Sequence, residues 1–231
     1  MEIWVDTSEK QTILTAKEMG VLHGVTTNPS IAAKSGKALE KLLEEILSLQ
    51  EGPVTAQVTT HLASSMRVQA KSLLEFSSRI LVKIPATIEG YKAMHELSKL
   101  HIHPVATCIF HPNQVLLACK AGASYVAPYF SRLNDAGEDA KCVLEEMMKI
   151  ISLNRFQTKL LVASLRTSEQ VRDCIDLGVH AMTLNPLVFK DFISDHNLTL
   201  QNLERFAKDW ESAKRSTLLP EKESFSFQSA V

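Results

Sequence analysis

Short apolar runs alternate with longer amphipathic segments along almost the whole chain. Val54–Val58 and Ile80–Ile84 belong to the first kind, and such runs of β-branched and aliphatic residues are typical of parallel strands buried on both faces. Ala38–Leu49 belongs to the second kind. Its leucines fall on one side and its glutamates on the other, which is typical of a helix that covers a sheet. The pattern therefore predicts alternating strands and helices.

From the first residue onward, the alternation predicts eight strand–helix pairs and one further helix. The strands are expected at Ile3–Val5, Gly24–Pro29 (running into a turn), Val54–Val58, Ile80–Ile84, Pro104–Ile109, Tyr125–Pro128, Lys159–Ala163 and Ala181–Leu184. The helices are expected at Ser8–Met19 with Ser8 as the cap, then Ala38–Leu49, Leu62–Phe76, Glu89–Lys99, Asn113–Ala121, Asp139–Ile151, Glu169–Leu177, Pro186–Phe192 and finally Thr199–Lys214.

Eight such pairs without a linker or a change of composition favour an α/β fold: a single (β/α)8 TIM barrel with an extra C-terminal helix. Residues 1–216 are expected to form this one domain, and residues 217–231 a flexible polar tail. A doubly wound open sheet is the alternative. That fold usually carries a glycine-rich phosphate-binding turn after its first strand, and no glycine follows Ile3–Val5 closely.

Composition narrows the class of protein. The 231 residues have a net charge of -1 and no cluster of Lys and Arg, so nucleic acid is not an expected partner. There is no cationic, apolar signal region and no apolar run near the roughly 20 residues that span a bilayer, so we expect a cytoplasmic protein. The cysteines are widely spaced without a Cys-x-x-Cys pair, so neither a disulfide framework nor a zinc site is predicted.

Lys83 interrupts the apolar run Ile80–Pro85 and is the first candidate for chemistry. Because burying an unpaired ammonium is costly, burial lowers the pKa of a lysine and favours its neutral amine. A lysine near its reference pKa of about 10.4 is only ~0.1% neutral around pH 7.5, whereas a pKa of roughly 7 to 8 leaves about half of it neutral. A neutral amine can form a Schiff base with a carbonyl substrate. The alternative is a lysine whose head reaches water at the mouth of the strand.

Polar residues stand at the end of every predicted strand. In barrels of this type the chemistry lies at the carboxyl ends of the strands, so these residues are expected to share one pocket with Lys83. They are Asp6, Thr26, Asn28, Gln57, Thr107, Tyr129, Ser164, Arg166 and Thr183. Strand alternation is expected to turn one pair of residues from each of six strands to the interior: Trp4 and Asp6, Thr55 and Gln57, Leu81 and Lys83, Val105 and Thr107, Ala127 and Tyr129, and Val162 and Ser164.

An anion site is expected at the rim of this pocket. Arg132, Ser164 and Arg166 would supply two guanidinium groups and a hydroxyl, which suit a phosphate. The sequence therefore predicts a pocket for a carbonyl compound that carries a phosphate. His101 and His103 share a strand face, but they lie at the amino end of their strand without an evident third ligand, so no metal site is predicted.

Several stretches resemble the small transaldolase and fructose-6-phosphate aldolase family of class I aldolases. They are Val5–Thr7, Gly24–Ser30, Val82–Gly90, Ala121–Tyr129 and Ala163–Arg166, with Gln114 and Asp209–Trp210. The resemblance implies a (β/α)8 barrel, a Schiff-base lysine at Lys83, a sugar-phosphate substrate, and neither a metal nor another cofactor. It also implies a homo-oligomer, of decamer type, with the last helix packing on a neighbouring subunit.

Roles for individual residues follow from the same resemblance. The catalytic residues would be Lys83, Tyr129, Asp6, Gln57 and Thr107. The substrate-binding residues would be Thr26, Asn28, Arg132, Ser164 and Arg166, with Asn28 and Asp6 on the donor hydroxyls. His111 and Asn185 depart from the family pattern, in two loops expected to border the pocket, so the natural substrate or acceptor is left open.

Gln57 and Tyr129 decide which reaction is expected. The transaldolases that resemble this chain generally carry glutamate and phenylalanine at these positions, so the pair favours an aldolase that converts fructose 6-phosphate to dihydroxyacetone and glyceraldehyde 3-phosphate. The alternative is a transaldolase that transfers the dihydroxyacetone unit to an aldose phosphate. A barrel that binds a sugar phosphate without turning it over would be expected to lack the amine or its acid/base partner, and neither is missing.

Overall fold

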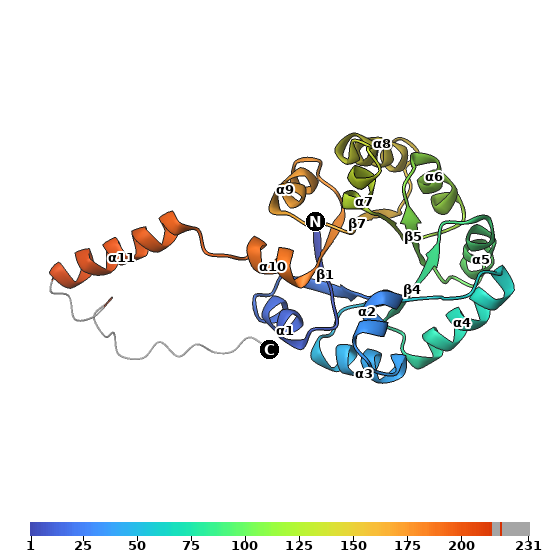
Figure 1. Ribbon diagram of the computed structural model, residues 1–231, viewed down its shortest axis with the longest axis horizontal. Coiled ribbons are helices and arrows are strands. Elements are labelled where there is room, and N and C mark those ends of the chain that lie inside the picture. The colour runs from blue at the N-terminus through green and yellow to red at the C-terminus, as the bar shows by residue number, and fades with distance from the viewer. Residues whose placement is uncertain (214–217, 219–231) are drawn as a thin grey trace. The chain divides into compact units, whose positions relative to one another are not determined.

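The computed structural model describes residues 1–213 and 218, and within them eight parallel strands close into a barrel in sequence order (Figure 1). The strands are β1 (Glu2–Asp6), β2 (Leu22–Thr26), β3 (Val54–Gln57), β4 (Ile80–Pro85), β5 (Val105–Ile109), β6 (Tyr125–Pro128), β7 (Lys159–Val162) and β8 (Ala181–Leu184). Since β1 pairs with both β2 and β8, no strand edge is left open. The predicted (β/α)8 barrel is confirmed, and the doubly wound sheet is wrong.

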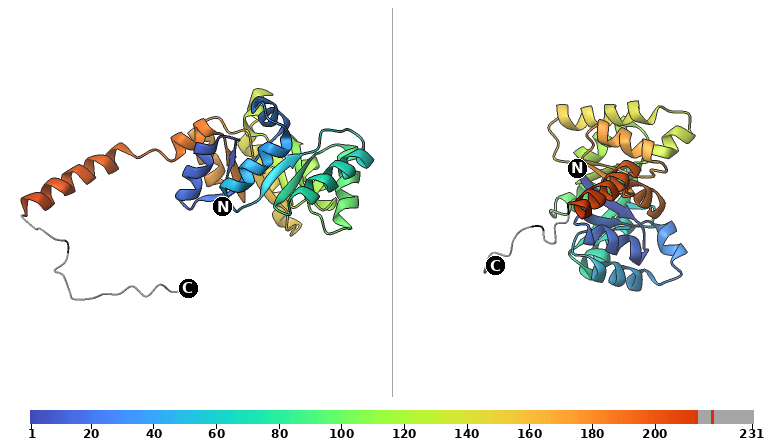
Figure 2. Two further views of the ribbon diagram at one scale, coloured as in Figure 1. Left: turned by 90° about the horizontal axis from the view of Figure 1, so that it is seen from below. Right: turned by 90° about the vertical axis from the view of Figure 1, so that its left-hand side faces the viewer.

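Helices surround the strands, as Figures 1 and 2 show for the barrel. They are α1 (Lys10–Glu18), α2 (Pro29–Lys34), α3 (Leu39–Leu49), α4 (Ala63–Phe76), α5 (Ile88–Ser98), α6 (Pro112–Lys120), α7 (Phe130–Asp135), α8 (Ala140–Leu153), α9 (Ser168–Asp176) and α10 (Pro186–Phe192). In α3 the buried side chains are Leu42, Leu43 and Ile46, which is the apolar face that the sequence predicted. The amphipathic pattern therefore records which side of each helix meets the barrel.

Two short helices were not expected from the sequence. The side chain of Asn28 accepts a hydrogen bond from the backbone N–H of Ile31 at 2.9 Å, and Pro29 fits the first turn, so α2 begins directly after β2. α7 begins directly after Tyr129. Both helices follow the carboxyl ends of strands, which is the edge where the polar strand ends meet.

The predicted cap of the first helix is wrong. The N-cap of α1 is Glu9, and no side chain caps it, whereas the sequence suggested Ser8. The hydroxyl of Thr7 instead accepts a hydrogen bond from the backbone N–H of Glu9 at 2.9 Å, and Thr12 donates to the Glu9 carboxylate at 2.6 Å. These two hydrogen bonds stabilise the start of α1, which Ser8 was expected to cap.

One apolar cluster fills the barrel interior toward the amino ends of the strands. It consists of Trp4, Val105, Tyr125, Ala127, Leu161 and Ala181, with Leu81 packed against it. The cluster confirms the inward face predicted for β1, β4, β5 and β6. For β7 the prediction is wrong, because Leu161 rather than Val162 points inward. Glu2 lies beneath, where its carboxylate accepts hydrogen bonds from the Tyr125 hydroxyl (3.0 Å) and the Trp4 indole (3.2 Å).

The chain separates into two compact units, Met1–Phe192 and a second unit that begins at Ile193 and contains α11 (Asn197–Ser212). Within α11 the apolar residues Leu200, Leu203 and Phe206 recur at helical spacing, and each is exposed. The predicted helix end at Lys214 and nearly all of the predicted tail, residues 217–231, lie outside the described residues. No helix in the described part of the chain is long and apolar enough to cross a membrane.

Candidate active site

A hollow of about 440 Å³ opens at the carboxyl ends of the strands. Its lining comes from all eight strands, at their carboxyl ends or in the segments directly after them, which only a closed barrel brings together. The lining residues are Asp6, Asn28, Pro29, Ser30, Gln57, Lys83, Cys108, Tyr129, Arg132, Ala163, Ser164, Leu165, Arg166 and Asn185. Eight of the ten predicted site residues are in this set: Asp6, Asn28, Gln57, Lys83, Tyr129, Arg132, Ser164 and Arg166.

Lys83 lies in the hollow with only 4% of its surface exposed. Its amine donates a hydrogen bond to the backbone carbonyl of Thr27 at 3.1 Å, a partner that the sequence did not indicate. Burial lowers the pKa of the Lys83 amine, while the charges of Asp6 and Cys108 oppose that shift. The prediction of a buried lysine is confirmed, and the water-exposed alternative is wrong. Lowering this pKa increases the fraction of the neutral, nucleophilic form.

Asp6 is held in place by two buried threonines. Its carboxylate accepts a hydrogen bond from the hydroxyl of Thr26 at 2.6 Å, and that hydroxyl lies 2.7 Å from the hydroxyl of Thr183. Both threonines are buried. Thr26 therefore contacts the site through Asp6 and does not itself line the hollow.

Tyr129 has a similar support. Its hydroxyl lies 2.9 Å from the hydroxyl of Thr107 and 3.9 Å from the sulfur of Cys108. Thr107 is fully buried behind the lining, like Thr26. Burial raises the pKa of Tyr129 to about 12, so the phenol keeps its proton at neutral pH and can donate a hydrogen bond.

The positive side of the hollow is built on α7 and on the segment after β7. The guanidinium of Arg132 lies 5.1 Å from the centre of the Tyr129 ring, which is a cation–π distance. Ser164 adopts a positive φ of 60°, so the chain turns sharply beside Ala163. Arg166 forms an ion pair with Asp135, a contact that the sequence did not predict.

Gln57 and Asn28 complete the hollow. Gln57 is the register partner of Lys83 in the pairing of β3 with β4, so its amide lies beside the lysine strand. Asn28 combines its place in the lining with the capping bond to α2. Both are positions where an amide can bind the hydroxyl groups of a substrate.

Six lining residues were missing from the predicted set: the polar or nucleophilic Ser30, Cys108 and Asn185, and the apolar Pro29, Ala163 and Leu165. Cys108 reaches the site because its φ of 59° breaks the alternation of β5 just past Thr107. A cysteine gives no sign of this conformation in the sequence. Asn185 lies in one of the two loops predicted to border the hollow, and for this loop the prediction is confirmed. His111 does not line it, because its ring accepts a hydrogen bond from Asn113 N–H and caps α6.

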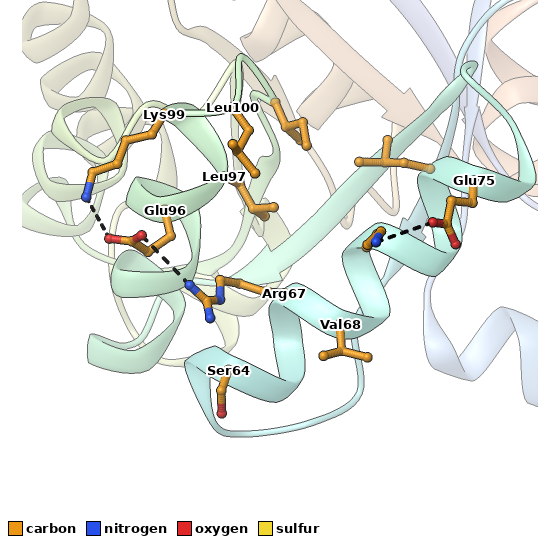
Figure 3. Close-up of a pocket in the computed structure, with 11 residues that line it drawn as sticks. Ser64, Arg67, Val68, Glu75, Glu96, Leu97, Lys99 and Leu100 are labelled. Carbon is orange, nitrogen blue, oxygen red and sulfur yellow. Dashed lines mark hydrogen bonds and ion pairs between the residues drawn. The ribbon is translucent and has the colours of Figure 1, made fainter.

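A second hollow, of about 660 Å³, lies between α4 and α5 on the outside of the barrel (Figure 3). Its lining includes the aliphatic residues Val68, Leu97 and Leu100 and ion pairs such as Arg67 with Glu96. It contains no buried ionisable group. The hollow around Lys83 is therefore the candidate active site.

Metal binding does not follow from the described geometry. Within residues 1–213 and 218, no group of three or more His, Cys, Asp or Glu side chains is placed to hold a metal ion. His103 bonds the carbonyl of Gly122 through Nδ1 at 3.0 Å instead. The expectation of a metal-free reaction stays a prediction.

Comparison with known proteins agrees with this geometry. Residues 3–224 match the family described as Transaldolase/Fructose-6-phosphate aldolase. A protein named probable transaldolase from Streptococcus pyogenes serotype M2 (strain MGAS10270) is 39% identical over 216 residues, which cover 93% of this chain and 100% of that protein. A second probable transaldolase, from Symbiobacterium thermophilum, is 39% identical over 214 residues, which cover 93% of this chain and 99% of that protein.

Proposed function

The chain belongs to the transaldolase/fructose-6-phosphate aldolase family, and we propose that it is a class I aldolase that cleaves fructose 6-phosphate to dihydroxyacetone and glyceraldehyde 3-phosphate. The observation that carries this proposal is an almost fully buried lysine, Lys83, in a polar hollow at the carboxyl ends of the barrel strands. The nucleophile of the reaction is its neutral amine.

Lys83 begins the reaction by attacking the C2 carbonyl of the ketose, and loss of water gives a protonated imine. The imine accepts the electron pair of the C3–C4 bond as that bond breaks. The C4 hydroxyl loses its proton at the same time, and Asp6, whose carboxylate lines the same hollow, is the base that we assign to it. Glyceraldehyde 3-phosphate leaves, and the three-carbon donor stays on Lys83 as an enamine.

Tyr129 completes the aldolase reaction. A proton delivered to C3 of the enamine restores the imine, which water then hydrolyses to free dihydroxyacetone. The Tyr129 phenol stays protonated at neutral pH and is held by the hydroxyl of Thr107. Because Thr107 is buried behind the lining, the amide of Gln57, which lines the hollow, is the group that we assign to hold the water. A phenyl ring at position 129 could not relay this proton.

The substrate's phosphate is assigned to the positive side of the hollow. Arg132, Arg166 and the hydroxyl of Ser164 line that side, and arginine binds phosphate through several N–H donors at once. Asn28 and Thr26 remain assigned to the donor end, Asn28 directly and Thr26 through Asp6. The sugar-phosphate class of substrate fits the family.

Transaldolase activity is the second candidate function. The two compared relatives are both named probable transaldolase, which favours transfer of the dihydroxyacetone unit. The enamine would then wait for an aldose phosphate instead of being protonated. The two reactions share every step up to the enamine, so Lys83 has the same role in both.

Product analysis separates the two functions. The protein is incubated with fructose 6-phosphate, with and without erythrose 4-phosphate, and free dihydroxyacetone and the seven-carbon ketose phosphate are measured. Free dihydroxyacetone without an acceptor supports the aldolase. Transfer to erythrose 4-phosphate with no free dihydroxyacetone supports the transaldolase, and neither product with either mixture refutes both. The Lys83→Met protein is the matched control.

Assembly into a homo-oligomer is a further part of the proposal. The apolar residues of α11 form a stripe that water would otherwise cover, and such stripes usually pack on another surface. We assign that surface to a second copy of the chain. Location in the cytoplasm stays a prediction of the sequence.

A further inference from the structure

Arg166 does not stand free at the rim of the hollow. Its Nη1 donates to Oδ1 of Asp135 at 3.0 Å, and its Nη2 lies 2.9 Å from Oδ2 of the same carboxylate. The contact thus joins the two terminal nitrogens to the two oxygens. A guanidinium has five N–H donors, so three remain for another ligand. One anion is already bound to this arginine, yet most of its donors are unused.

Asp135 and Arg132 come from the same short helix. They stand three residues apart on α7, so they lie on neighbouring positions of one face. Arg132 stacks over the Tyr129 ring, and Asp135 holds Arg166. α7 therefore fixes both arginines that line the hollow, one directly and one through a carboxylate.

The segment that carries Arg166 is bound to the same helix by its backbone. The N–H of Ser131 donates to the carbonyl of Ser164 at 3.1 Å. The side chain of Gln170 accepts two hydrogen bonds, from the Arg166 N–H at 2.7 Å and from the Ser131 hydroxyl at 2.8 Å. Because these bonds hold the backbone of Arg166 against α7, the pair with Asp135 is what remains to fix its side chain.

Stability alone does not account for the ion pair. Both side chains are more than half exposed, at 55% for Arg166 and 56% for Asp135, and exposed ion pairs contribute little to the free energy of unfolding. Holding a long arginine side chain in one conformation, by contrast, lowers the entropic cost of ordering that side chain when a ligand binds. The pairing is thus suited to ligand binding.

We propose that Asp135 is a positioning residue of the phosphate site, which holds Arg166 so that its free N–H donors are ready for the phosphate of the substrate. The inference rests on the proposed function, since it takes the ligand to be a sugar phosphate. Asp135 itself does not touch the substrate in this account. The opposite role, a carboxylate that competes with the phosphate for Arg166, is the outcome that the test must exclude.

The test compares the Asp135→Asn protein with the unmutated protein in the direction of synthesis. Dihydroxyacetone is the donor, and the acceptor is either glyceraldehyde 3-phosphate or glyceraldehyde. Ordering one flexible side chain corresponds to about 2-fold to 12-fold in affinity. We expect KM for glyceraldehyde 3-phosphate to rise by about that factor with kcat nearly unchanged, KM for glyceraldehyde to stay the same, and Asp135→Glu to restore part of the loss.

Three results would overturn the inference. KM for glyceraldehyde 3-phosphate that falls would mean that the carboxylate competes with the phosphate. An unchanged KM would mean that the pair has no role in binding, and equal rises for both acceptors would mean a general structural effect. Asp176→Asn is the matched control, because it removes the same charge from an exposed residue outside the hollow and is expected to change neither KM.

Failure of the proposed function is recognised separately. If the unmutated protein forms no borohydride-reducible adduct with dihydroxyacetone, the proposed function is refuted. The inference is then judged by calorimetric titration with inorganic phosphate, which needs no turnover. Weaker phosphate binding by Asp135→Asn than by Asp176→Asn supports it, and equal binding overturns it.

Discussion

The hydroxyl of Thr107 lies 2.9 Å from the hydroxyl of Tyr129 at the wall of the hollow that contains Lys83. Thr107 is fully buried, so its hydroxyl has few other partners and fixes the phenol in one place. A phenol held in this way can relay a proton between water and an intermediate bound to the lysine. The aldolase branch of the proposed reaction depends on this contact.

Tyr129→Phe tests the relay. Loss of a positioned acid/base group typically lowers a rate by about 10²-fold to 10⁴-fold, so we expect release of free dihydroxyacetone to fall by that factor. Transfer of the donor to erythrose 4-phosphate should survive or rise, because it needs no protonation of the enamine. Chromatography of both products measures the ratio.

Tyr125→Phe is the control for that variant. Tyr125 also buries its ring and donates its hydroxyl proton, but to Glu2 at the opposite end of the barrel. Its loss should lower stability without changing the ratio of the two products. Equal release of dihydroxyacetone by the Tyr129→Phe and unmutated proteins would show that the phenol is not the relay.

Lys83→Met should stabilise the protein, and the gain should depend on pH. Burial lowers the pKa of Lys83 from its ordinary value of 10.5, so between the lowered pKa and 10.5 the unfolded chain binds more protons than the folded one. The stability of the unmutated protein therefore rises with pH across that window. The gain from Lys83→Met is largest below the lowered pKa and shrinks as the pH approaches 10.5.

Urea unfolding of both proteins at several pH values between about 6 and 10 measures this gain. A gain that is independent of pH would contradict a lowered pKa for Lys83. Lys92→Met is a suitable comparison, because Lys92 is exposed on α5 and pairs with Glu89 at 2.7 Å. Its replacement should change stability only slightly at any of these pH values.

Gly90→Ala should distort the end of the lysine strand. A Cβ atom at position 90 would lie 1.9 Å from the carbonyl oxygen of Pro85, the last residue of β4. Overpacking of this kind costs about 1 to 3 kcal/mol, and here the backbone two residues after Lys83 must move. We expect both lower stability in urea and lower activity. Full activity at unchanged stability would contradict this expectation, because it would show that a methyl group fits at position 90 without disturbing β4.

Leu203→Glu combined with Phe206→Glu should separate the subunits. Both residues belong to the exposed apolar stripe of α11, and two charges there oppose its burial against another chain. Gln201→Glu, on the polar side of the same helix, should have no effect. Light scattering reports the mass, and a mass near 25.7 kDa for the unmutated protein at micromolar concentration would refute the oligomer.

The barrel was predictable because its signals are local. Ile80–Pro85 is apolar except for Lys83, and Pro85 closes the run. Strand β4 and its central lysine could therefore be inferred directly. Leu42, Leu43 and Ile46 repeat at helical spacing, which gave α3 and its buried face. Eight repetitions of such signals left few alternatives for the fold.

The face of β7 was not predictable in the same way. Leu160, Leu161 and Val162 are all apolar, so the alternation that distinguishes inside from outside is absent. Counting back from Ser164 chose the wrong face, because the positive φ at that residue shifts the direction of its side chain. The short helices α2 and α7 were missed for a related reason, since six residues are too few to show a helical period.

Two contacts of the candidate site depend on the closed fold. Lys83 bonds the backbone carbonyl of Thr27, and a carbonyl has no signature in the sequence. Arg166 pairs with Asp135, which lies on a helix that the sequence did not reveal. The sequence thus indicated which residue types meet in the hollow, while the pairing among them required the structure.

Trapping with borohydride tests the central claim most directly. The protein is incubated with dihydroxyacetone, reduced with borohydride, digested and mapped by mass spectrometry. We predict one adduct for each chain, on the peptide that contains Lys83, and no adduct in the Lys83→Met protein. An adduct on another lysine, or turnover by Lys83→Met close to that of the unmutated protein, would contradict the account.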